Sequence, residues 1–424
     1  MKYAVIIAAG AADAPNQDLE GQTPLQIAAT PTLDRLARAG RVGTARLTPA
    51  GLAPTTDLVI PVLLGVDAFA AGVGPGGVLA AGVSPEPGAT ELGPDDWGIV
   101  ADLVSVDDAG QIQPSAAATP EETQALLSAV EAHWAAAASE AWAGCRLHPC
   151  RDGRAVMIDR TRADLSAVQT TPPWEALDEP WERHAPTAPG ADRSQADRLS
   201  RLIESSYDAL RDHDVNAARV ELGQPPLNAI WLWGPGVFPH MADITVRTGL
   251  SVAIIAADPI VRGVAKAINA DVLLPSSDDE AGLGQAACDA IDRYDLVIVH
   301  ADRPASASFA GDPHAKADAL RRLDAGVIAP IAAHLETFGD AEAQPDRRGW
   351  RVMVAADRYI LTDEQRPDPT PVPFAIAGAW VRSVVPRSMT ESDANISDLH
   401  IDPGHELLEY FLRGGLARVR PVRG

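Results

Sequence analysis

Cysteine is scarce in this chain, and its three residues are Cys145, Cys150 and Cys288. An odd number at these spacings matches no redox motif, so we expect no disulfide framework and a reducing, cytoplasmic setting. His148 lies between the first two cysteines, which raises the alternative of a zinc site. A single Cys pair without a second pair is a weak zinc motif.

Long apolar runs are missing as well. No stretch approaches the roughly 20 uninterrupted apolar residues that are needed to cross a bilayer. Residues 1–10 carry one charge and a short apolar run, whereas a signal peptide needs a longer hydrophobic region and a cleavage site. We therefore interpret this segment as a buried first strand.

Basic residues are in the minority. The chain has 35 Lys and Arg against 58 Asp and Glu, which gives a formal net charge of −23. This charge disfavours nucleic acids and anionic membranes as partners. A small phosphorylated metabolite would need a local cluster of Arg or Lys, because the overall field repels it. The composition carries no signal for the oligomeric state.

Strand-like apolar runs alternate with helical patterns along much of the chain, which predicts a doubly wound α/β sheet. The predicted core strands are residues 3–7, 229–233, 252–256, 296–300 and 352–356, and the clearest predicted helices are residues 30–40, 282–294 and 315–337. At 424 residues, the chain is long enough for a large core that carries a second domain.

The composition changes in the middle of the chain. Residues 67–178 are rich in Gly, Pro and Ala, with short predicted strands at 99–106 and 155–159 and an Ala-rich helix at 120–143. We therefore predict a smaller α+β domain, residues 67–178, inserted between two core segments, residues 1–66 and 179–424.

Chemistry is expected where the strand 296–300 ends, because open α/β sheets bind ligands beyond the carboxyl ends of their strands. The following loop, residues 301–312, consists mostly of alanine, serine and phenylalanine together with a few charged residues. It looks like a metal-site loop from which metal ligands have been removed.

Motifs spread over nearly the whole chain share one resemblance. They are residues 6–13, 21–25, 30–37, 57, 63–67, 72–75, 213–216 with 219, 228–234, 294–300, 371–374 and 404–407. In this order they resemble the archaeal-type cofactor-independent (2,3-bisphosphoglycerate-independent) phosphoglycerate mutase family of the alkaline phosphatase superfamily. The resemblance implies an alkaline-phosphatase-like fold and an isomerase that interconverts 3- and 2-phosphoglycerate in glycolysis.

The resemblance also implies a hydroxyl nucleophile beside two divalent metal ions, which are Mn, Zn or Mg in such enzymes. The nucleophile position falls on Thr56, just before Asp57, and threonine keeps the hydroxyl group. The metal-ligand positions fall on Ala9, Ala305, Phe309, Asp357, Arg358 and a position near Pro367.

Of these ligand positions, Asp357 alone keeps a metal-binding side chain. One carboxylate cannot hold two dications, and Ala9, Ala305 and Phe309 supply no lone pair. We therefore expect no metal cofactor and a chain that is inactive or altered in catalysis. Substrate-binding side chains are missing too, because Val73 stands where the family has an arginine and Gly76-Gly77 replaces an acidic position.

Four arginines could still gather a phosphorylated ligand. Arg219 and Arg262 stand where the resemblance places an arginine and a phosphate-binding lysine, and Arg151 would come from the inserted domain. Arg358 would put a fixed positive charge at a lost ligand position, where it could bind phosphate bidentately. The alternatives are solvated charges for the first three and an internal salt bridge for Arg358.

Other candidates also have ordinary structural interpretations. Thr55-Thr56-Asp57 can be a helix cap, and His300 can be a strand-end histidine with satisfied hydrogen bonds. Asp302, Asp312 and His314 could form a relocated ligand set or be isolated surface groups. Trp231 and Trp233 could pack in the core or form a binding platform. Residues 276–280 could begin a helix or mimic a calcium loop.

Three functions therefore compete. The first is an active mutase that works through Thr56 with a relocated metal site. The second is a metal-free binding module, or pseudoenzyme, that holds a phosphorylated metabolite through its arginines. The third is an enzyme of altered, metal-independent chemistry. Family resemblance alone does not decide among them, because function depends on the site.

Overall fold

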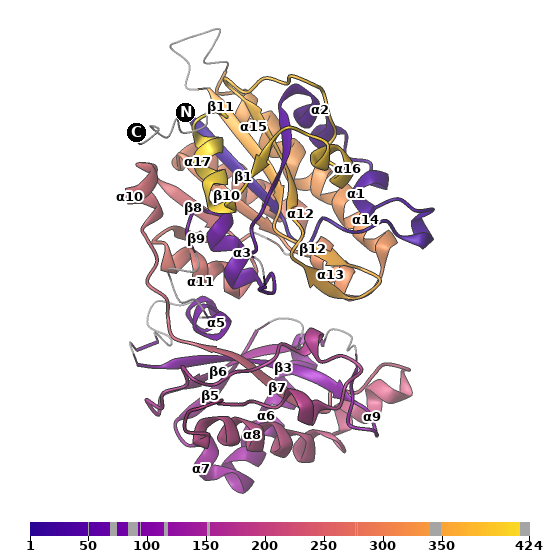
Figure 1. Ribbon diagram of the computed structural model, residues 1–424, viewed down its shortest axis with the longest axis vertical. Coiled ribbons are helices and arrows are strands. Elements are labelled where there is room, and N and C mark those ends of the chain that lie inside the picture. Colours follow the sequence, from indigo (N-terminus) through magenta and orange to yellow (C-terminus); the bar gives the residue numbers. More distant parts are fainter. Residues whose placement is uncertain are drawn as a thin grey trace. The chain divides into compact units, whose positions relative to one another are not determined.

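The computed structural model describes residues 1–49, 51–67, 74–83, 92–93, 95–113, 118–150, 153–275, 277, 279–339 and 349–415. The chain divides into two compact units. Unit 1 comprises Met1–Ala70, Met241–Ala257 and Ile268–Gly424, and unit 2 comprises Ala71–His240 and Asp258–Ala267 (Figure 1).

Unit 1 contains the larger sheet. Its strands are β1 (Lys2–Ala8), β2 (Arg41–Ala45), β8 (Val252–Ile255), β9 (Asp271–Leu273), β10 (Leu296–Ala301), β11 (Trp350–Ala356), β14 (Val372–Gly378) and β15 (His400–Ile401). Within the described residues they pair in the order β15-β2-β14-β11-β1-β10-β8-β9. A separate hairpin pairs β12 (Tyr359–Leu361) with β13 (Arg366–Asp368).

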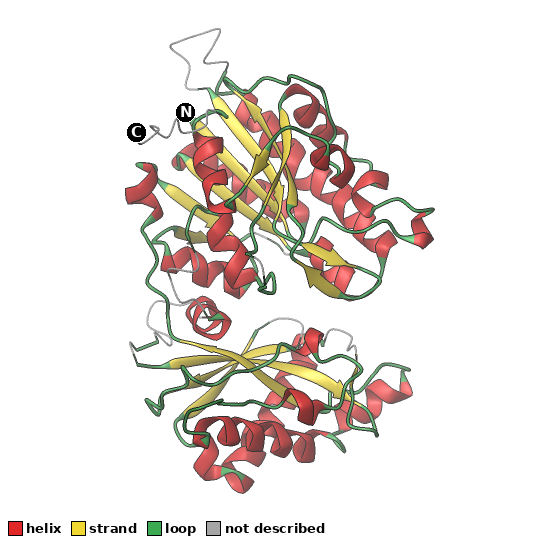
Figure 2. Ribbon diagram, in the orientation of Figure 1, coloured by secondary structure: helices red, strands yellow, loops and turns green. Residues whose placement is uncertain are grey.

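The helices of unit 1 cover both faces of this sheet (Figure 2). They are α1 (Pro24–Ile27), α2 (Pro31–Ala39), α3 (Thr56–Leu63), α10 (Ile244–Thr248), α12 (Glu280–Arg293), α13 (Arg303–Phe309), α14 (Pro313–Leu323), α15 (Ala329–Glu336), α16 (Glu391–Asn395) and α17 (Leu407–Leu412), with short turns η1 (Gln17–Leu19) and η5 (Gly404–Glu406). Figure 1 shows α3 and α17 on one face of the sheet and α12 and α15 on the other.

The apolar runs form strands because every β1 residue from Ala4 to Ala8 is buried between two parallel neighbours. The pairing is in register to the strand ends, where Ala8 lies opposite both Ala301 of β10 and Ala356 of β11. The residues that follow these three strands therefore emerge at one edge of the sheet.

The long helix predicted at residues 315–337 is one helical stretch with a π-helical turn, η4 (Asp324–Ile328), between α14 and α15. Here the chain passes close to α12. A Cβ added to Gly284 of α12 would lie only 2.0 Å from the Gly326 oxygen, so glycine permits this backbone approach.

Unit 2 is built on a second, antiparallel sheet. Its strands are β3 (Trp97–Val106), β4 (Ile112–Gln113), β5 (Cys145–Pro149), β6 (Arg154–Asp159) and β7 (Ala229–Gly236). Its helices are α5 (Pro75–Val83), α6 (Pro120–Ala137), α7 (Ser139–Trp142), α8 (Ser194–Leu210), α9 (Asp214–Glu221) and α11 (Pro259–Ala267), with short turns η2 (Pro173–Glu175) and η3 (Trp181–His184). Trp134 of α6 donates from Nε1 to the Leu202 oxygen of α8 at 3.0 Å, which joins the two longest helices.

The strand at 229–233 differs from its prediction. We expected it in the core sheet, but β7 pairs antiparallel with β3, with Val104 opposite Ala229. Unit 2 accordingly extends beyond the expected boundary at residue 178 as far as His240, and it includes α11 as well. A continuous apolar strand has the same pattern in either sheet, so its partner could not be predicted from the run itself.

The predicted fold class is confirmed. Unit 1 has a largely parallel sheet between helical layers, and unit 2 is a smaller α+β unit. No helix in the described part of the chain combines the length and the apolar character that a membrane span requires. The three cysteines are free thiols in this structure.

Candidate anion site at the strand ends of unit 1

The carboxyl ends of β1 and β11 bring together two of the predicted ligand positions. Ala9 follows β1, and Asp357 follows β11 on the neighbouring strand. The Asp357 carboxylate is fully buried, and its Oδ1 accepts a hydrogen bond of 2.7 Å from the Gly10 backbone N–H. Gly10 has a φ of +61°, a conformation that favours glycine, and it turns the chain so that its N–H points at Asp357.

Ala9 and Ala305 meet in a small apolar cluster with Ile360, and their exposed fractions are 1 %, 6 % and 0 %. The packing between this cluster and Gly10 is tight. A Cβ added to Gly10 would lie 2.5 Å from Ile360 Cδ1 and 3.0 Å from the Cβ of Ala305. At two positions that would carry metal ligands in the family, apolar side chains therefore pack together with Ile360.

The β12–β13 hairpin shows where the predicted ligand position near Pro367 lies. Ile360 of β12 lies directly opposite Pro367 of β13 in the antiparallel register. The last predicted ligand position therefore adjoins the same cluster through Ile360. Phe309 differs, because this residue is 39 % exposed at the end of α13 and is not a member of the cluster.

These residues do not fit a pair of metal ions. Alanine, isoleucine and proline side chains offer no lone pair, and the Asp357 carboxylate is engaged by Gly10 and Arg358. Within the described ranges, no group of three or more His, Cys, Asp and Glu side chains is arranged to hold a metal ion.

A guanidinium group lies beside the nucleophile position. The Nη1 atom of Arg358 donates a hydrogen bond of 2.8 Å to the Thr56 hydroxyl and lies 3.4 Å from Asp357 Oδ2. The Arg358 side chain is only 9 % exposed. The internal salt bridge considered for Arg358 is therefore present, and it uses one terminal nitrogen.

The other edge of the Arg358 guanidinium makes no hydrogen bond to any residue that the structure describes. This edge carries Nε and Nη2, the pair of donors that binds a carboxylate or phosphate in a bidentate manner. The arrangement can therefore hold an oxyanion next to the Thr56 hydroxyl while Nη1 stays bonded within the protein.

Thr56 begins α3, as the helix-start interpretation of Thr55-Thr56-Asp57 requires. Thr55 is the N-cap residue, and its backbone oxygen accepts from Leu58 and Val59 at 3.0 and 2.9 Å. The Thr55 side chain makes no capping hydrogen bond, however. The Thr56 hydroxyl is buried with an exposed residue fraction of 8 % and is turned toward Arg358, so this segment is more than a cap.

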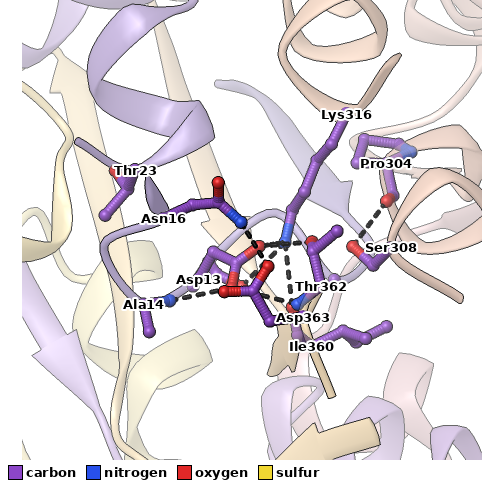
Figure 3. Close-up of polar contacts among 12 residues, drawn as sticks. Asp13, Ala14, Asn16, Thr23, Pro304, Ser308, Lys316, Ile360, Thr362 and Asp363 are labelled. Carbon is purple, nitrogen blue, oxygen red and sulfur yellow. Dashed lines mark hydrogen bonds and ion pairs between the residues drawn. The ribbon is translucent and has the colours of Figure 1, made fainter. Parts of the chain in front are cut away.

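A buried lysine that the sequence analysis missed supports this edge of the sheet (Figure 3). Lys316 of α14 is fully buried, and its Nζ donates to Asp13 Oδ2 at 2.9 Å and to the Ala12 and Ile360 oxygens at 3.1 Å. Burial lowers the pKa of Lys316, and the Asp13 carboxylate opposes this effect. The contacts join the loop after β1 to the β12 strand that carries Ile360.

Glu391 extends this buried network on the side of Asp13. Its carboxylate accepts from the Asp13 backbone N–H at 3.0 Å and from the Thr23 hydroxyl at 2.7 Å. Burial raises the pKa of Glu391, although both hydrogen bonds and Lys316 act to lower it. A lysine or glutamate in a helical segment gives no signal of burial in a single sequence, which is why both were missed.

The other predicted arginines lie in unit 2. Arg219 is 2 % exposed, with Nη1 at 3.1 Å from Glu122 Oε1 and Nε donating to the Pro225 oxygen at 3.0 Å. Arg262 is half-buried, and its Nε donates to the Gly82 oxygen at 3.0 Å. These contacts give both arginines structural roles in unit 2, and their part in ligand binding stays a prediction. Arg151 lies outside the described residues, as does Val73.

The relocated ligand set does not form among the described residues. Asp302 stands at the N-cap position of α13, and Asp312 caps α14 by accepting from the Ala315 N–H at 2.8 Å. His314 is exposed. The zinc alternative at Cys145 and Cys150 likewise finds no metal-binding group in the described part of the chain.

Two of the ordinary structural interpretations are confirmed. Trp231 and Trp233 are 1 % and 4 % exposed, so they pack in the core of unit 2. Asp279 caps α12 by accepting from the Gly282 N–H at 2.9 Å, so this part of the acidic segment begins a helix. Residues 276 and 278 lie outside the described residues.

His300 departs from its prediction. We expected a strand-end histidine with satisfied hydrogen bonds, but neither Nδ1 nor Nε2 has a hydrogen-bond partner among the described residues. The side chain is nonetheless buried, with an exposed residue fraction of 3 %. A buried polar group without a partner costs about 1–3 kcal/mol, so this histidine is not explained by packing.

Comparison with known proteins gives one consistent result. Residues 37–216 match the model of the 2,3-bisphosphoglycerate-independent phosphoglycerate mutase family. A protein of that name from Methanothrix thermoacetophila is 29 % identical and is aligned over 98 % of this chain and 100 % of its own length. Another from Methanopyrus kandleri is 30 % identical over 89 % of this chain and 88 % of its own.

The fold has a counterpart among solved structures. The PH0037 protein from Pyrococcus horikoshii superposes with a TM-score of 0.71 at 22 % sequence identity. The match covers 98 % of this chain and 97 % of that one, so the likeness of fold extends over both units.

Proposed function

Because this chain belongs to the 2,3-bisphosphoglycerate-independent phosphoglycerate mutase family, which has an alkaline-phosphatase-like fold, we propose that it binds a phosphorylated metabolite at Arg358 without divalent metals and does not carry out the mutase reaction. The observation that carries the proposal is the bond between Arg358 and Thr56 beside a packed Ala9–Ala305–Ile360 cluster. The resemblance assigns the Arg358 position to a metal ligand, and a fixed positive charge there supports anion binding without metal.

The charges around Arg358 favour recognition by directed hydrogen bonds. Asp357 lies 3.4 Å from Nη1 and balances much of the guanidinium charge. An incoming phosphoryl group would be held mainly by the Nε and Nη2 donors, with the Thr56 hydroxyl free to donate once its oxygen accepts from Nη1. The side chains of the site thus bind and orient an oxyanion without supplying two metal ions.

Two arms of one experiment test this proposal. EDTA-treated protein would be titrated calorimetrically with inorganic phosphate and with 3-phosphoglycerate, and the same protein would be tested for conversion of 3-phosphoglycerate in a coupled assay with and without Mn²⁺. We expect binding in the first arm and no conversion in the second. Conversion that depends on Mn²⁺ would overturn the proposal, as would the absence of binding by either anion.

A pair of matched variants identifies the binding group. Arg358→Met removes the guanidinium, and we expect the affinity for phosphate to fall by roughly 10- to 100-fold, as loss of charge-assisted hydrogen bonds predicts. Arg46→Met is the control, because Arg46 bonds to Asp402 at the surface of the same unit and its side chain is 43 % exposed. Equal affinities in the two variants would contradict the assignment to Arg358.

The same contact favours a second candidate, metal-independent phosphotransfer. A guanidinium that donates to the Thr56 hydroxyl would also stabilise the alkoxide that this hydroxyl becomes when it loses its proton. The alkoxide would then bond to phosphorus while the phosphorus–oxygen bond to the metabolite breaks, and the departing oxygen would take up the proton. Incubation with radiolabelled 3-phosphoglycerate followed by denaturation distinguishes this candidate. Covalent label that is lost in Thr56→Val would favour transfer, whereas reversible binding without label supports the binding module.

A further inference from the structure

The unpartnered imidazole of His300 lies on the face of the sheet that carries α3. In the parallel register His300 is opposite Ile7 of β1, so the two side chains project from the same face. Tyr3 lies four residues before Ile7 on that face, and its ring packs against Phe411 of α17 at a centroid distance of 5.9 Å. Figure 1 shows α17 and α3 together on this side of β1 and β10.

His300 is also close to the edge where the site lies. It is the last residue but one of β10, whose end is level with the ends of β1 and β11. Because neighbouring strands are about 4.8 Å apart, β10 and β11 are separated by roughly 10 Å across β1. His300 and Arg358, the second residue after β11, therefore lie at the same edge of the sheet, with β1 between their two strands.

Packing gives no reason for a histidine at this position. The neighbouring β10 residues Val297, Ile298 and Val299 are completely buried and apolar. An apolar residue at position 300 would continue the run without leaving two ring nitrogens unbonded in the interior. Residues that lower stability in this way are often retained for binding or catalysis.

We propose that His300 is a second ligand-contacting residue of this site, which bonds to a polar group at the far end of the phosphorylated ligand. This inference rests on the proposed function at Arg358. The phosphoryl group binds at Arg358, and a carboxylate or hydroxyl oxygen several ångströms away bonds to the His300 ring. An inorganic phosphate ion is too small to reach both residues.

Nitrogen NMR of the histidine rings tests the contact directly in the full-length protein. The chain has 10 histidines, and the His300 signals would be assigned by their loss in His300→Leu. We expect saturating 3-phosphoglycerate to shift the His300 ring ¹⁵N resonances by several ppm, whereas inorganic phosphate leaves them in place. The ring signals of His334, whose Nε2 lies 3.0 Å from Asp292, provide an internal control.

Stability and affinity of two variants complete the experiment. His300→Leu should raise the melting midpoint by roughly 2–4 °C, since it removes unbonded nitrogens, while weakening 3-phosphoglycerate binding at least 5-fold. His300→Gln keeps a polar group and should retain more of the affinity. His334→Leu, the control, should leave the affinity unchanged.

The outcomes separate this inference from the proposed function. If both anions bind through Arg358 but 3-phosphoglycerate neither shifts His300 nor loses affinity in His300→Leu, the second contact is wrong and the anion site stands. If neither anion binds the wild-type protein, both proposals fail. A lower melting midpoint for His300→Leu with unchanged 3-phosphoglycerate affinity would assign His300 a purely structural role.

Discussion

The guanidinium of Arg358 and the hydroxyl of Thr56 are joined by a hydrogen bond of 2.8 Å in the interior of unit 1. Their chain positions are far apart, and the bond unites the start of α3 with the loop after β11. It places a permanent cation at the hydroxyl that the family resemblance identifies as the nucleophile position.

Replacement of Ile360 by alanine tests the apolar cluster. Ile360 is fully buried against Ala9 and Ala305, so Ile360→Ala should leave a cavity and lower the free energy of unfolding by about 2–5 kcal/mol. Urea denaturation provides the measurement, and Ile27→Ala, at a residue that is 37 % exposed, is the control. If Ile360→Ala costs no more than Ile27→Ala, the cluster is not close-packed.

Lys316 tests the buried ion pair behind the site. Lys316→Met would leave the Asp13 carboxylate buried without its cation, and we expect a loss of about 3–5 kcal/mol in the free energy of unfolding. Adding Asp13→Asn should recover part of the loss, since the uncompensated charge is then removed. Lys266→Met, at an exposed lysine, is the control for the loss of a lysine. Additive effects of Lys316→Met and Asp13→Asn would argue against coupling of the pair.

Glu391 predicts a pH dependence of stability. Burial raises its pKa above the ordinary value of 4.5, so between 4.5 and the raised value the folded state binds more protons than the unfolded state. The contribution of this group is therefore fully present below pH 4.5 and is lost as the pH rises through the folded pKa. Thermal melts from pH 4 to 8 should show a smaller decline across this window in Glu391→Gln than in the wild type. Parallel curves would contradict the assigned direction.

The cysteines predict slow thiol chemistry. Burial raises the pKa of Cys145 to about 11 and that of Cys150 to about 12, so the reactive thiolate is rare at neutral pH. In the native protein at pH 8, we expect iodoacetamide to modify both residues far more slowly than in urea, as peptide mass spectrometry can quantify. Rapid native alkylation of Cys145 would show that this part of unit 2 opens readily.

The sequence was sufficient for the fold class and for placing the candidate site at the strand ends. Strands β1, β10 and β11 were predicted within a few residues, because buried parallel strands are continuous apolar runs. The positions of Ala9 and Asp357 after neighbouring strands agree with the rule that ligands gather at the carboxyl ends of such strands. The family resemblance supplied the positions to compare.

The other features depend on strand pairing and side-chain contacts that cannot be predicted from the pattern of a single sequence. Strand β7 pairs in unit 2 although its apolar run suits either sheet. Lys316 is fully buried although lysine is usually exposed, because Asp13 and two carbonyl oxygens from distant segments satisfy its three donors. The role of Ile360 in filling the space between Ala9 and Ala305 was likewise invisible without the hairpin that presents it.

The central claim is that Arg358 takes the place of metal ions in this site. The affinity for 3-phosphoglycerate with and without metal tests this claim most directly. The account predicts that calorimetric titration of EDTA-treated protein gives a dissociation constant within about 2-fold of that measured with 1 mM Mn²⁺ or Zn²⁺, a difference of about 0.4 kcal/mol, with no tightly bound metal recovered from the chain. Binding that appears only after metal is added, together with two bound ions per chain, would contradict it.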